Sequence, residues 1–519
     1  AICRLKRVAA DLAGDVRPWL PQIPEQKNGK RVACVGAGCA SLTVANDLLP
    51  LGYDVVIFEQ FNITGGLMRT NIPAFRLPAP VLDDEINMIL EMGVDLRLDH
   101  RVDSMQALLK EDFDAVFVGT GAPRGKELEL PGRHDSDRIH IGIDWLESVA
   151  FEHTDSIGEK VLIIGVGNTA MDCCRTSLRL GGQDVKVMAR KPRGHFKAST
   201  WELEDAEEEQ VEIVVNHSPR EFVIKDGKLV GMRFDHLEYS EDSAGNLGSK
   251  VIGEEFLPCD DVILAIGQEN AFEWIERDIG ITFDEWDVPA VDKITHQSTR
   301  DGVFFGGDAA FGPENIIWAV EHGHQAAISI HHYCANQSVH DRLPVGMNLA
   351  STKMSIHEWS FSNDFDPSVR RQMRHVDLKK RFDELNIEVE LGFSSEQAVI
   401  EIQRCLNCDV QTVFNEKLCI ECDACIDICP VLCLTITENG EEAELRQRLT
   451  APAENKDQAI FVSKGLPQTG RVMVKDEDLC VHCSLCAERC PTGAWDMRKS
   501  TLLIPYAIDE EAAWARKAG

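Results

Sequence analysis

Apolar residues gather in two stretches that follow the same order of elements. In residues 31–60 an apolar run, Val32–Val35, precedes a segment with helical spacing, and a second run, Val55–Phe58, closes the stretch. Residues 161–193 repeat this order. Short apolar runs separated by a helical pattern are typical of strand–helix–strand units with a parallel sheet. The pattern therefore predicts two α/β domains.

A glycine pair lies between the first strand and the helix of each unit. Gly36 and Gly38 occupy this turn in the first unit, and Gly165 and Gly167 in the second. Glycine lets backbone N–H groups approach a pyrophosphate at the N-terminus of a helix. Ser41 replaces the third glycine of the first motif, and its small side chain still lets helix and strand pack closely. We therefore predict two dinucleotide sites, whose nucleotides can bring their reactive rings together.

The residues that end the second strand differ between the two units. Glu59 lies 21 residues beyond Gly38, where a carboxylate can accept hydrogen bonds from ribose hydroxyls. Arg190 and Lys191 stand at the corresponding end of the second unit, and cations there suit a 2′-phosphate. We therefore expect FAD in the first site and NADPH in the second.

Two later apolar runs also end in glycine turns, one at Thr120 and Gly121 and the other at Gly307 and Asp308. A carboxylate at the second junction could hold a ribityl hydroxyl of the flavin. Because this run follows the NADPH unit, we expect the second nucleotide domain to be inserted into the first. The expected division is an N-terminal helical segment (1–30), the FAD domain with a connector (31–157), the NADPH domain (158–268), the second part of the FAD domain (269–335), a helical linker (336–400) and a ferredoxin-like domain with an insertion (401–519).

Other segments are interpreted without a role in chemistry. Residues 72–78 contain two prolines and are predicted to form a loop that lies across a ligand. The acidic stretch 201–210 is expected to be a solvated helix face. Four histidines between His322 and His332 are expected to be packing or surface residues, because no cysteine or carboxylate pair shares their face at ligand spacing.

Cysteines concentrate in the C-terminal part of the chain. Of 18 cysteines, eleven lie between Cys405 and Cys490, which argues for metal-bound thiolates rather than disulfides. The spacing C-x-x-C-x-x-C-x-x-x-C-P occurs twice, from Cys419 and from Cys480. In this two-cluster ferredoxin spacing the fourth cysteine of each run ligates the other [4Fe–4S] cluster. One cluster is thus assigned to Cys419, Cys422, Cys425 and Cys490, and the other to Cys480, Cys483, Cys486 and Cys429.

Three further cysteines, Cys405, Cys408 and Cys433, fall outside the repeated spacing. Together they supply only three of the four ligands that a tetrahedral site needs. A zinc site in place of the clusters would use C-x-x-C pairs without the third cysteine and the trailing proline. We favour structural or incidental thiols over a third metal centre, which would raise the iron content well above about eight per chain.

Charge and length restrict the classes of partner and the cellular location that we expect. The net charge of −33 disfavours nucleic acid and anionic membranes as partners, and it fits either solubility or a protein partner with a basic docking face. No apolar run approaches the roughly 20 residues of a membrane span and no leader sequence is evident, so a cytoplasmic protein is expected. With the motifs, the 519 residues predict an α/β fold of two interleaved Rossmann-like dinucleotide-binding domains plus a small α+β two-cluster ferredoxin domain.

Residues 1–335 resemble the small (β) subunit of NADPH-dependent glutamate synthase and the flavin half of dihydropyrimidine dehydrogenase. The motifs that carry the resemblance are VGAG-x-AS, GGLM followed by IPAFRLP, GVGNTAMD, AIGQ and GGDAAFGPENII. The resemblance implies FAD and NADPH as cofactors. In this family an N-terminal iron–sulfur helical domain normally precedes a segment like residues 1–11, and the resemblance leads us to expect that this domain is missing here. The C-terminal portion resembles fusions in which such a diaphorase serves a larger oxidoreductase.

Matching these motifs residue by residue implies the contacts of both nucleotides. The FAD contacts would fall on Gly36, Gly38, Ser41, Glu59, Gly66, Leu67, Arg76, Val102, Thr120, Gly121, Gly307 and Asp308. The NADPH contacts would fall on Gly165, Gly167, Asn168, Thr169, Arg190, Lys191 and Lys197. No protein residue is expected to act as a catalytic acid or base, because the cofactors supply the chemistry.

Three hypotheses on function follow. The first is an electron-transfer (diaphorase) subunit that moves electrons between NADP(H), FAD and two [4Fe–4S] clusters, to or from ferredoxin or a larger oxidoreductase such as a 2-oxoacid:acceptor oxidoreductase. The second is the small subunit of an NADPH-dependent glutamate synthase, against which the ferredoxin portion counts. The third is a docking subunit with vestigial sites, which the intact motifs disfavour. A disulfide reductase is disfavoured because Cys34 and Cys39 straddle the glycine turn and the adjacent Cys173 and Cys174 suit no disulfide.

Overall fold

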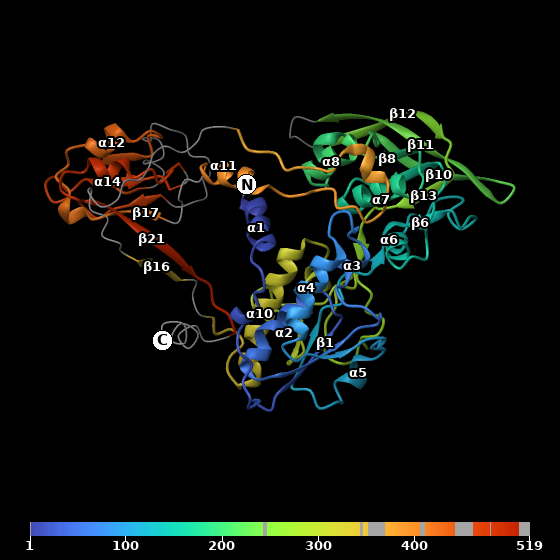
Figure 1. Cartoon of the computed structure of the whole chain (residues 1–519), viewed down its shortest axis with the longest axis horizontal. Helices are drawn as coiled ribbons and strands as arrows, with labels where there is room; N and C mark the ends of the chain where they lie inside the picture. The colour runs from blue at the N-terminus through green and yellow to red at the C-terminus, as the bar shows by residue number, and fades with distance from the viewer. Residues whose placement is uncertain are drawn as a thin grey trace. The chain divides into compact units, whose positions relative to one another are not determined.

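The computed structural model describes residues 2–241, 247–342, 346–350, 369–404, 410–441, 460–477 and 479–507. These residues form two compact units (Figure 1). The larger unit contains residues 15–342 and 374–391 and the described residues from Tyr506. The smaller unit contains the described residues among 2–14, 343–373 and 392–505. Cys405 and Cys408 lie outside the described residues.

The first nucleotide domain is built on a five-stranded parallel sheet in the order β15-β4-β1-β2-β3. Its apolar central strands are buried on both faces, as parallel sheets require. A Cβ at Gly323 would lie 2.6 Å from the Ala40 carbonyl oxygen, so glycine lets α10 pack directly on α2. The elements are β1 (Arg31–Val35), β2 (Asp54–Phe58), β3 (Asp95–Arg97), β4 (Ala115–Val118), β15 (Val303–Phe305), α2 (Cys39–Leu48), α3 (Leu67–Thr70), α4 (Ala79–Leu90), α5 (Met105–Leu108), α9 (Asp308–Phe311) and α10 (Ile316–Cys334).

The second nucleotide domain has its own five-stranded parallel sheet in the order β6-β13-β7-β8-β9. Its core contains the buried residues of β7 and α7, including Val161, Ile163 and Met171. The elements are β6 (Ile139–Ile141), β7 (Lys160–Ile164), β8 (Asp184–Met188), β9 (Glu212–Val214), β13 (Asp261–Leu264), α6 (Gly142–Ala150), α7 (Asn168–Arg179) and α8 (Thr200–Glu208).

The two domains are interleaved, which confirms the predicted fold class. The chain leaves the first sheet after β4, completes the second domain and returns to pair β15 with β4. Both crossings run side by side as a short antiparallel pair of β5 (Arg124–Gly125) and β14 (Gln268–Glu269). The inserted part also carries an antiparallel sheet that the motifs did not separate, made of β10 (His217–Lys225), β11 (Lys228–Glu241) and β12 (Leu247–Leu257).

The smaller unit holds two three-stranded sheets and short helices. One sheet has the order β16-β21-β17 and the other β18-β20-β19. The helix α1 packs against α11, where the Arg7 side chain lies close to Gly392. The elements are α1 (Ile2–Asp11), β16 (Gly346–Ala350), α11 (Ser395–Ile402), β17 (Val410–Phe414), α12 (Ala424–Ile428), β18 (Leu434–Thr437), β19 (Phe461–Val462), β20 (Val472–Lys475), α14 (Leu485–Arg489) and β21 (Trp495–Leu503).

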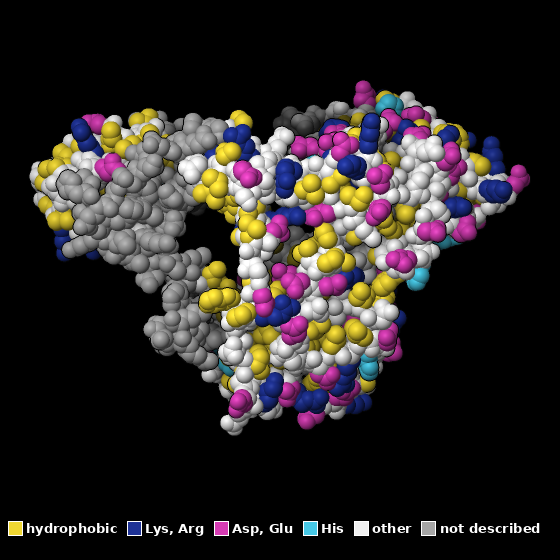
Figure 2. Space-filling model, viewed as in Figure 1, with side chains coloured by type: hydrophobic (Ala, Val, Ile, Leu, Met, Phe, Trp, Pro, Cys, Tyr) yellow, Lys and Arg dark blue, Asp and Glu magenta, His cyan; other side chains and the backbone are white. Residues whose placement is uncertain are grey.

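The surface charges and the length of the helices bear on the partners expected from the sequence. Figure 2 shows acidic and basic side chains interspersed on the viewed face of the larger unit. Among the described residues, no helix combines the length and the apolar character that crossing a bilayer requires.

The expectation that residues 201–210 form a solvated face is wrong in part: Glu204, Glu207 and Glu208 are exposed, but three other acidic residues are not. Glu202 and Asp205 on α8 are buried, as is Glu209, which directly follows the helix, because these residues face arginines of α7 and of the segment 374–391. Arg175 donates to Glu209 at 2.9 Å and Arg179 donates to it at 2.7 Å. The neighbouring Glu208 accepts from Arg381 at 2.9 Å. The segment 374–391, which the sequence placed in a linker, is therefore fastened to the second nucleotide domain.

The loop of residues 72–78 is part of the same contact. Phe75 is fully buried, and the Arg179 guanidinium lies 3.9 Å from the centre of its ring. Val389 donates its backbone N–H to the Phe75 carbonyl oxygen at 2.9 Å. Phe75 thus ties the first nucleotide domain to the second, and the predicted contact of this loop with a ligand stays a prediction.

The network gives the stability a defined dependence on pH. Burial raises the pKa of Glu209, but hydrogen bonds from Arg179 and Arg175 outweigh it and lower the pKa to about 2 from 4.5. Because the folded pKa is the lower one, the stabilisation is complete above pH 4.5 and is lost as the pH falls towards about 2. We expect Glu209→Gln to unfold at lower urea than the parent at pH 7, with a difference that shrinks steadily below pH 4.5. A constant difference across this range would contradict the assignment.

Candidate functional site

Three turns of the first nucleotide domain meet at the carboxyl ends of β1, β2 and β4. Gly36 has φ +92° and a Cβ there would lie 2.8 Å from the Gly119 carbonyl oxygen. Gly66 has φ +53° and a Cβ would lie 3.1 Å from the Cα of Gly38. Only glycine fits such contacts at positive φ. The sequence-predicted residues Gly36, Gly38 and Gly66 are thus brought together, with Leu67 opening α3 beside them.

Two carboxylates border this cradle. Glu59 accepts from the backbone N–H groups of Ala37, at 2.8 Å, and Phe61, at 3.1 Å. Burial raises the pKa of Glu59, and these backbone donors oppose the rise. Asp308 begins α9 directly after Gly307, and burial raises the pKa of its carboxyl to about 6. Both groups stand where a nucleotide or a flavin could supply hydroxyl donors.

Two buried hydroxyls in the same place have no hydrogen-bond partner among the described residues. These are Ser41 Oγ, on a fully buried side chain, and Thr120 Oγ1, next to Gly121. Buried polar groups are nearly always paired, so a ligand with polar atoms in this cradle would satisfy both hydroxyls. A cradle lined by glycine backbone, with a carboxylate and unpaired hydroxyls, fits the dinucleotide FAD.

Arg76 and Val102 are not brought into the cradle. Arg76 donates to Asp172 at 2.6 Å and also pairs with Glu202, so its guanidinium is shared between acids of α7 and α8. Val102 packs against the core beneath the first sheet. Their contacts with FAD stay predictions.

The second cradle repeats the geometry at α7. Gly165 has φ +127° and its Cα faces the Ala265 carbonyl, which leaves no space for a Cβ. Gly167 caps α7, and a Cβ there would meet nothing within 4 Å. Asn168, in the first turn, accepts the Ser199 N–H at 2.9 Å. With Thr169, this turn presents free helix N–H groups over open space, as a pyrophosphate requires.

Three exposed cations surround the second cradle. Arg190 and Lys191 follow β8. Lys197 lies in a loop, and its backbone N–H donates to the Val166 carbonyl oxygen at 3.2 Å. None of the three has an ion-pair partner within the part of the chain that the structure describes, whereas the neighbouring Arg193 pairs with Glu207. Unpaired cations beside a helix N-terminus fit the 2′-phosphate of NADPH.

The two glycines of this turn give a matched pair of variants. Gly165→Ala should destabilise the protein by about 1–3 kcal/mol, because it forces a side chain into the Ala265 carbonyl at positive φ. Gly167→Ala should change the unfolding free energy by less than about 0.5 kcal/mol yet weaken NADPH binding, because its methyl group occupies the space left for the pyrophosphate. Urea unfolding and NADPH titration test this. Tight NADPH binding by Gly167→Ala would contradict the placement.

The cysteines near the two cradles are poor nucleophiles. Burial raises the pKa of Cys34 well above its usual range, and it raises that of Cys39 to about 11. Burial likewise raises the pKa values of the adjacent thiols of Cys173 and Cys174. Thiolates are the reactive form, so these four residues are unsuited to disulfide chemistry.

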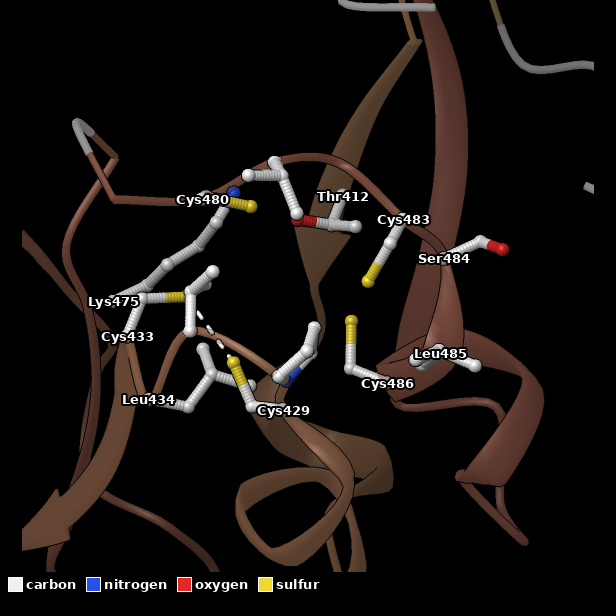
Figure 3. A pocket seen from close by; sticks show the side chains of 13 residues that line it. Thr412, Cys429, Cys433, Leu434, Lys475, Cys480, Cys483, Ser484, Leu485 and Cys486 are labelled. Atoms are coloured by element: carbon white, nitrogen blue, oxygen red, sulfur yellow. Dashed lines mark hydrogen bonds between the residues drawn. The ribbon is translucent and has the colours of Figure 1, made fainter. Parts of the chain in front are cut away.

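The two cysteine runs of the smaller unit line two cavities. We name the first the Cys419 cavity; its cysteines are Cys419, Cys422, Cys425 and Cys490. We name the second the Cys480 cavity; its cysteines of the repeated motif are Cys429, Cys480, Cys483 and Cys486 (Figure 3). The fourth cysteine of each run thus lies with the other run, as the crossed assignment requires.

The backbone of both runs is shaped in the same way. Glu421 and Asp423 have φ values of 55° and 58°, and the equivalent His482 and Ser484 have values of 50° and 64°. Left-handed residues in alternation turn successive N–H groups to one side, and such backbone nests bind anions. The Glu421 N–H, for example, lies 3.4 Å from the Cys419 sulfur. Four thiols and convergent N–H groups in each cavity fit a [4Fe–4S] cubane.

Sequence reasoning missed two residues of the Cys480 cavity. Cys433, interpreted as a structural or incidental thiol, lies with its sulfur 3.5 Å from that of Cys429. Lys475 on β20 also lines the cavity. The C-P-x-x-C spacing after Cys429 signalled the first. The second lies five residues before Cys480, but no motif marked it, because its place in the cavity depends on β20.

Family comparisons agree with both units. Residues 30–323 match the family described as pyridine nucleotide-disulphide oxidoreductase, and residues 418–494 match the 4Fe-4S dicluster domain. These matches confirm the predicted cofactors, FAD, NADPH and two [4Fe–4S] clusters. The first match covers both nucleotide domains.

Three relatives show how far the similarity extends. The β subunit of NADP(+)-dependent formate dehydrogenase from Moorella thermoacetica is 32% identical over 75% of this chain and 57% of its own length. The β subunit of NADPH-Fe(3+) oxidoreductase from Geobacter sulfurreducens is 31% identical over 78% of this chain and 65% of its own. The small chain of NADPH glutamate synthase from Azospirillum brasilense is 31% identical over 61% of this chain and 69% of its own length. The chain thus spans about three fifths of the length of the first two relatives.

The solved structure of FprA from Mycobacterium tuberculosis in complex with NADPH has a similar fold. It superposes with a TM-score of 0.51 at 17% identity over 59% of this chain and 85% of its own. The fold, the sequence relatives and the family match over both cradles agree. The chain therefore belongs to the pyridine nucleotide-disulphide oxidoreductase family.

Proposed function

We propose that the chain is an electron-transfer subunit that connects NADP(H), through FAD and two [4Fe–4S] clusters, with a larger oxidoreductase partner. The observation that carries the proposal is the combination, in one chain, of two dinucleotide cradles and two four-cysteine cavities. When bound, NADPH and FAD supply hydride chemistry and the clusters supply one-electron steps. The residues described here bind and orient these groups.

The relatives support this assignment over the alternative. Formate dehydrogenase and NADPH-Fe(3+) oxidoreductase β subunits align with 75% and 78% of the chain. The glutamate synthase small chain aligns with 61%. Because the longer alignments favour proteins named as β subunits of NADP(H)-linked oxidoreductases, we place a glutamate synthase small subunit second. A 2-oxoacid:acceptor oxidoreductase is one partner that the arrangement would suit.

The location of the electron outlet tests the proposal. Wild-type chain should transfer electrons from NADPH to a one-electron acceptor such as a ferredoxin. A Cys480→Ala/Cys490→Ala variant removes one proposed ligand from each cavity. Its transfer rate should be at least tenfold lower than that of the wild-type chain, while its flavin is still reduced by NADPH. An undiminished transfer rate in this variant would show that the clusters are not the outlet.

A further inference from the structure

The two cysteine cavities differ in the charged side chains around them. Lys475 lines the Cys480 cavity and its side chain is 1% exposed. Figure 3 shows its ammonium nitrogen beside the sulfur of Cys480. Its Nζ pairs at 2.8 Å with the partly exposed carboxylate of Glu477, which follows β20 in the chain. Glu421 and Asp423 are instead among the residues of the Cys419 cavity, and no lysine or arginine is among its described lining residues.

Side-chain donors line both cavities: Thr492 and Trp495 in the Cys419 cavity, and Cys433 and Thr412, besides Lys475, in the Cys480 cavity. The Cys433 thiol is buried and lies 3.5 Å from the Cys429 sulfur. Since four thiolates complete a cubane, this fifth thiol can keep its proton and donate it in a hydrogen bond to a ligand sulfur. Thr412 Oγ1 lines the same cavity, buried and without a partner in the described part of the chain.

A carboxylate takes the place of the cation in the Cys419 cavity. Glu421 is among its lining residues, and its backbone nitrogen lies 3.4 Å from the Cys419 sulfur. That carboxylate is held by Thr469 at 2.6 Å and by Arg471 at 3.0 Å. Negative charge is thus stabilised better in the Cys480 cavity.

Reduction adds an electron to a cluster that is already anionic. A buried cation and hydrogen bonds to the ligand sulfurs stabilise the reduced form and raise the reduction potential, and a nearby carboxylate does the reverse. We propose that the cluster in the Cys480 cavity has the higher potential of the two, set by Lys475 and Cys433, and therefore holds the first electron that enters the smaller unit. This inference rests on the proposed function, because it needs both clusters.

Anaerobic redox titration of the whole chain, followed by EPR, tests the inference without an activity assay. We expect two midpoints. In Lys475→Met the upper midpoint should fall, so that at a fixed potential the ratio of reduced to oxidised cluster drops at least tenfold, which is about 59 mV for one electron. The lower midpoint should stay in place. Lys475→Arg keeps the charge and should keep the upper midpoint.

Matched variants separate charge from structural damage. Glu421→Gln should raise the lower midpoint, and Cys433→Ala should lower the upper one while the iron content stays at about eight per chain. A shift of the lower midpoint in Lys475→Met, or no shift at all, would overturn the inference. A loss of about four irons in Cys433→Ala would also overturn it, because Cys433 would then be a ligand. A wild-type chain with far fewer than eight irons would instead contradict the proposed function.

Discussion

Two double variants that share Cys490→Ala should differ in the number of clusters they retain. Wild-type chain should hold about eight irons. Cys419→Ala/Cys490→Ala removes two ligands of one cavity and should keep about four irons, those of the Cys480 cavity. Cys480→Ala/Cys490→Ala removes one ligand from each cavity and should retain almost none. The prediction follows from the position of Cys490 among the residues of the Cys419 cavity.

The reverse ranking would show that each run of cysteines binds its own cluster. In that case Cys419→Ala/Cys490→Ala would lose both clusters and Cys480→Ala/Cys490→Ala only one. Cys259→Ala is the control, because Cys259 is buried in the second nucleotide domain, far along the chain from either run. Iron and sulfide analysis and the visible spectrum measure the outcome, and the flavin content reports whether the larger unit has folded.

Replacing Arg190 and Lys191 by alanine should remove the preference for NADPH. Both side chains are exposed and have no ion-pair partner among the described residues, so they are free to bind a phosphate. A hydrogen bond to a charged group contributes about 1.5–3 kcal/mol. The loss of two such bonds should weaken the binding of NADPH about a hundredfold or more. NADH lacks the 2′-phosphate, and its binding should change by less than about threefold.

Arg193→Ala is the matched control for this pair. Arg193 lies in the same loop but is paired with Glu207, so its removal should affect NADPH far less. The KM values of the single and double variants for both nucleotides provide the measurement. An equal loss for NADPH and NADH would contradict the assignment of the 2′-phosphate to Arg190 and Lys191.

The sequence was sufficient for features that depend on local spacing. The glycines at 36, 38, 165 and 167 and the cysteine runs are constrained by backbone geometry within a few residues, so their pattern predicted the turns and cavities. The insertion of one nucleotide domain into the other followed from the order of the strands. The predicted α/β fold class is confirmed by the sheet order.

Features that depend on long-range packing could not be predicted in this way. The acidic stretch around Glu209 has the composition of a solvated helix, and only the arginines that meet it from α7 and from Arg381 explain its burial. Arg76 was assigned to FAD by its motif, but its partners Asp172 and Glu202 lie far along the chain. Lys475 lies only five residues before Cys480, but its burial beside the Cys480 cavity depends on the pairing of β20 with β18 and β19.

We propose that one chain contains a continuous electron path from NADP(H) to both clusters. An anaerobic titration of the whole chain, run in both directions, tests it most directly, with flavin absorbance and the cluster EPR signal followed together. We expect NADPH to bleach the flavin and to reduce the clusters, or chemically reduced clusters to be reoxidised by NADP⁺ with formation of NADPH. If the flavin responds to NADPH while the clusters exchange electrons in neither direction, the path is broken within the chain and the proposed function is contradicted.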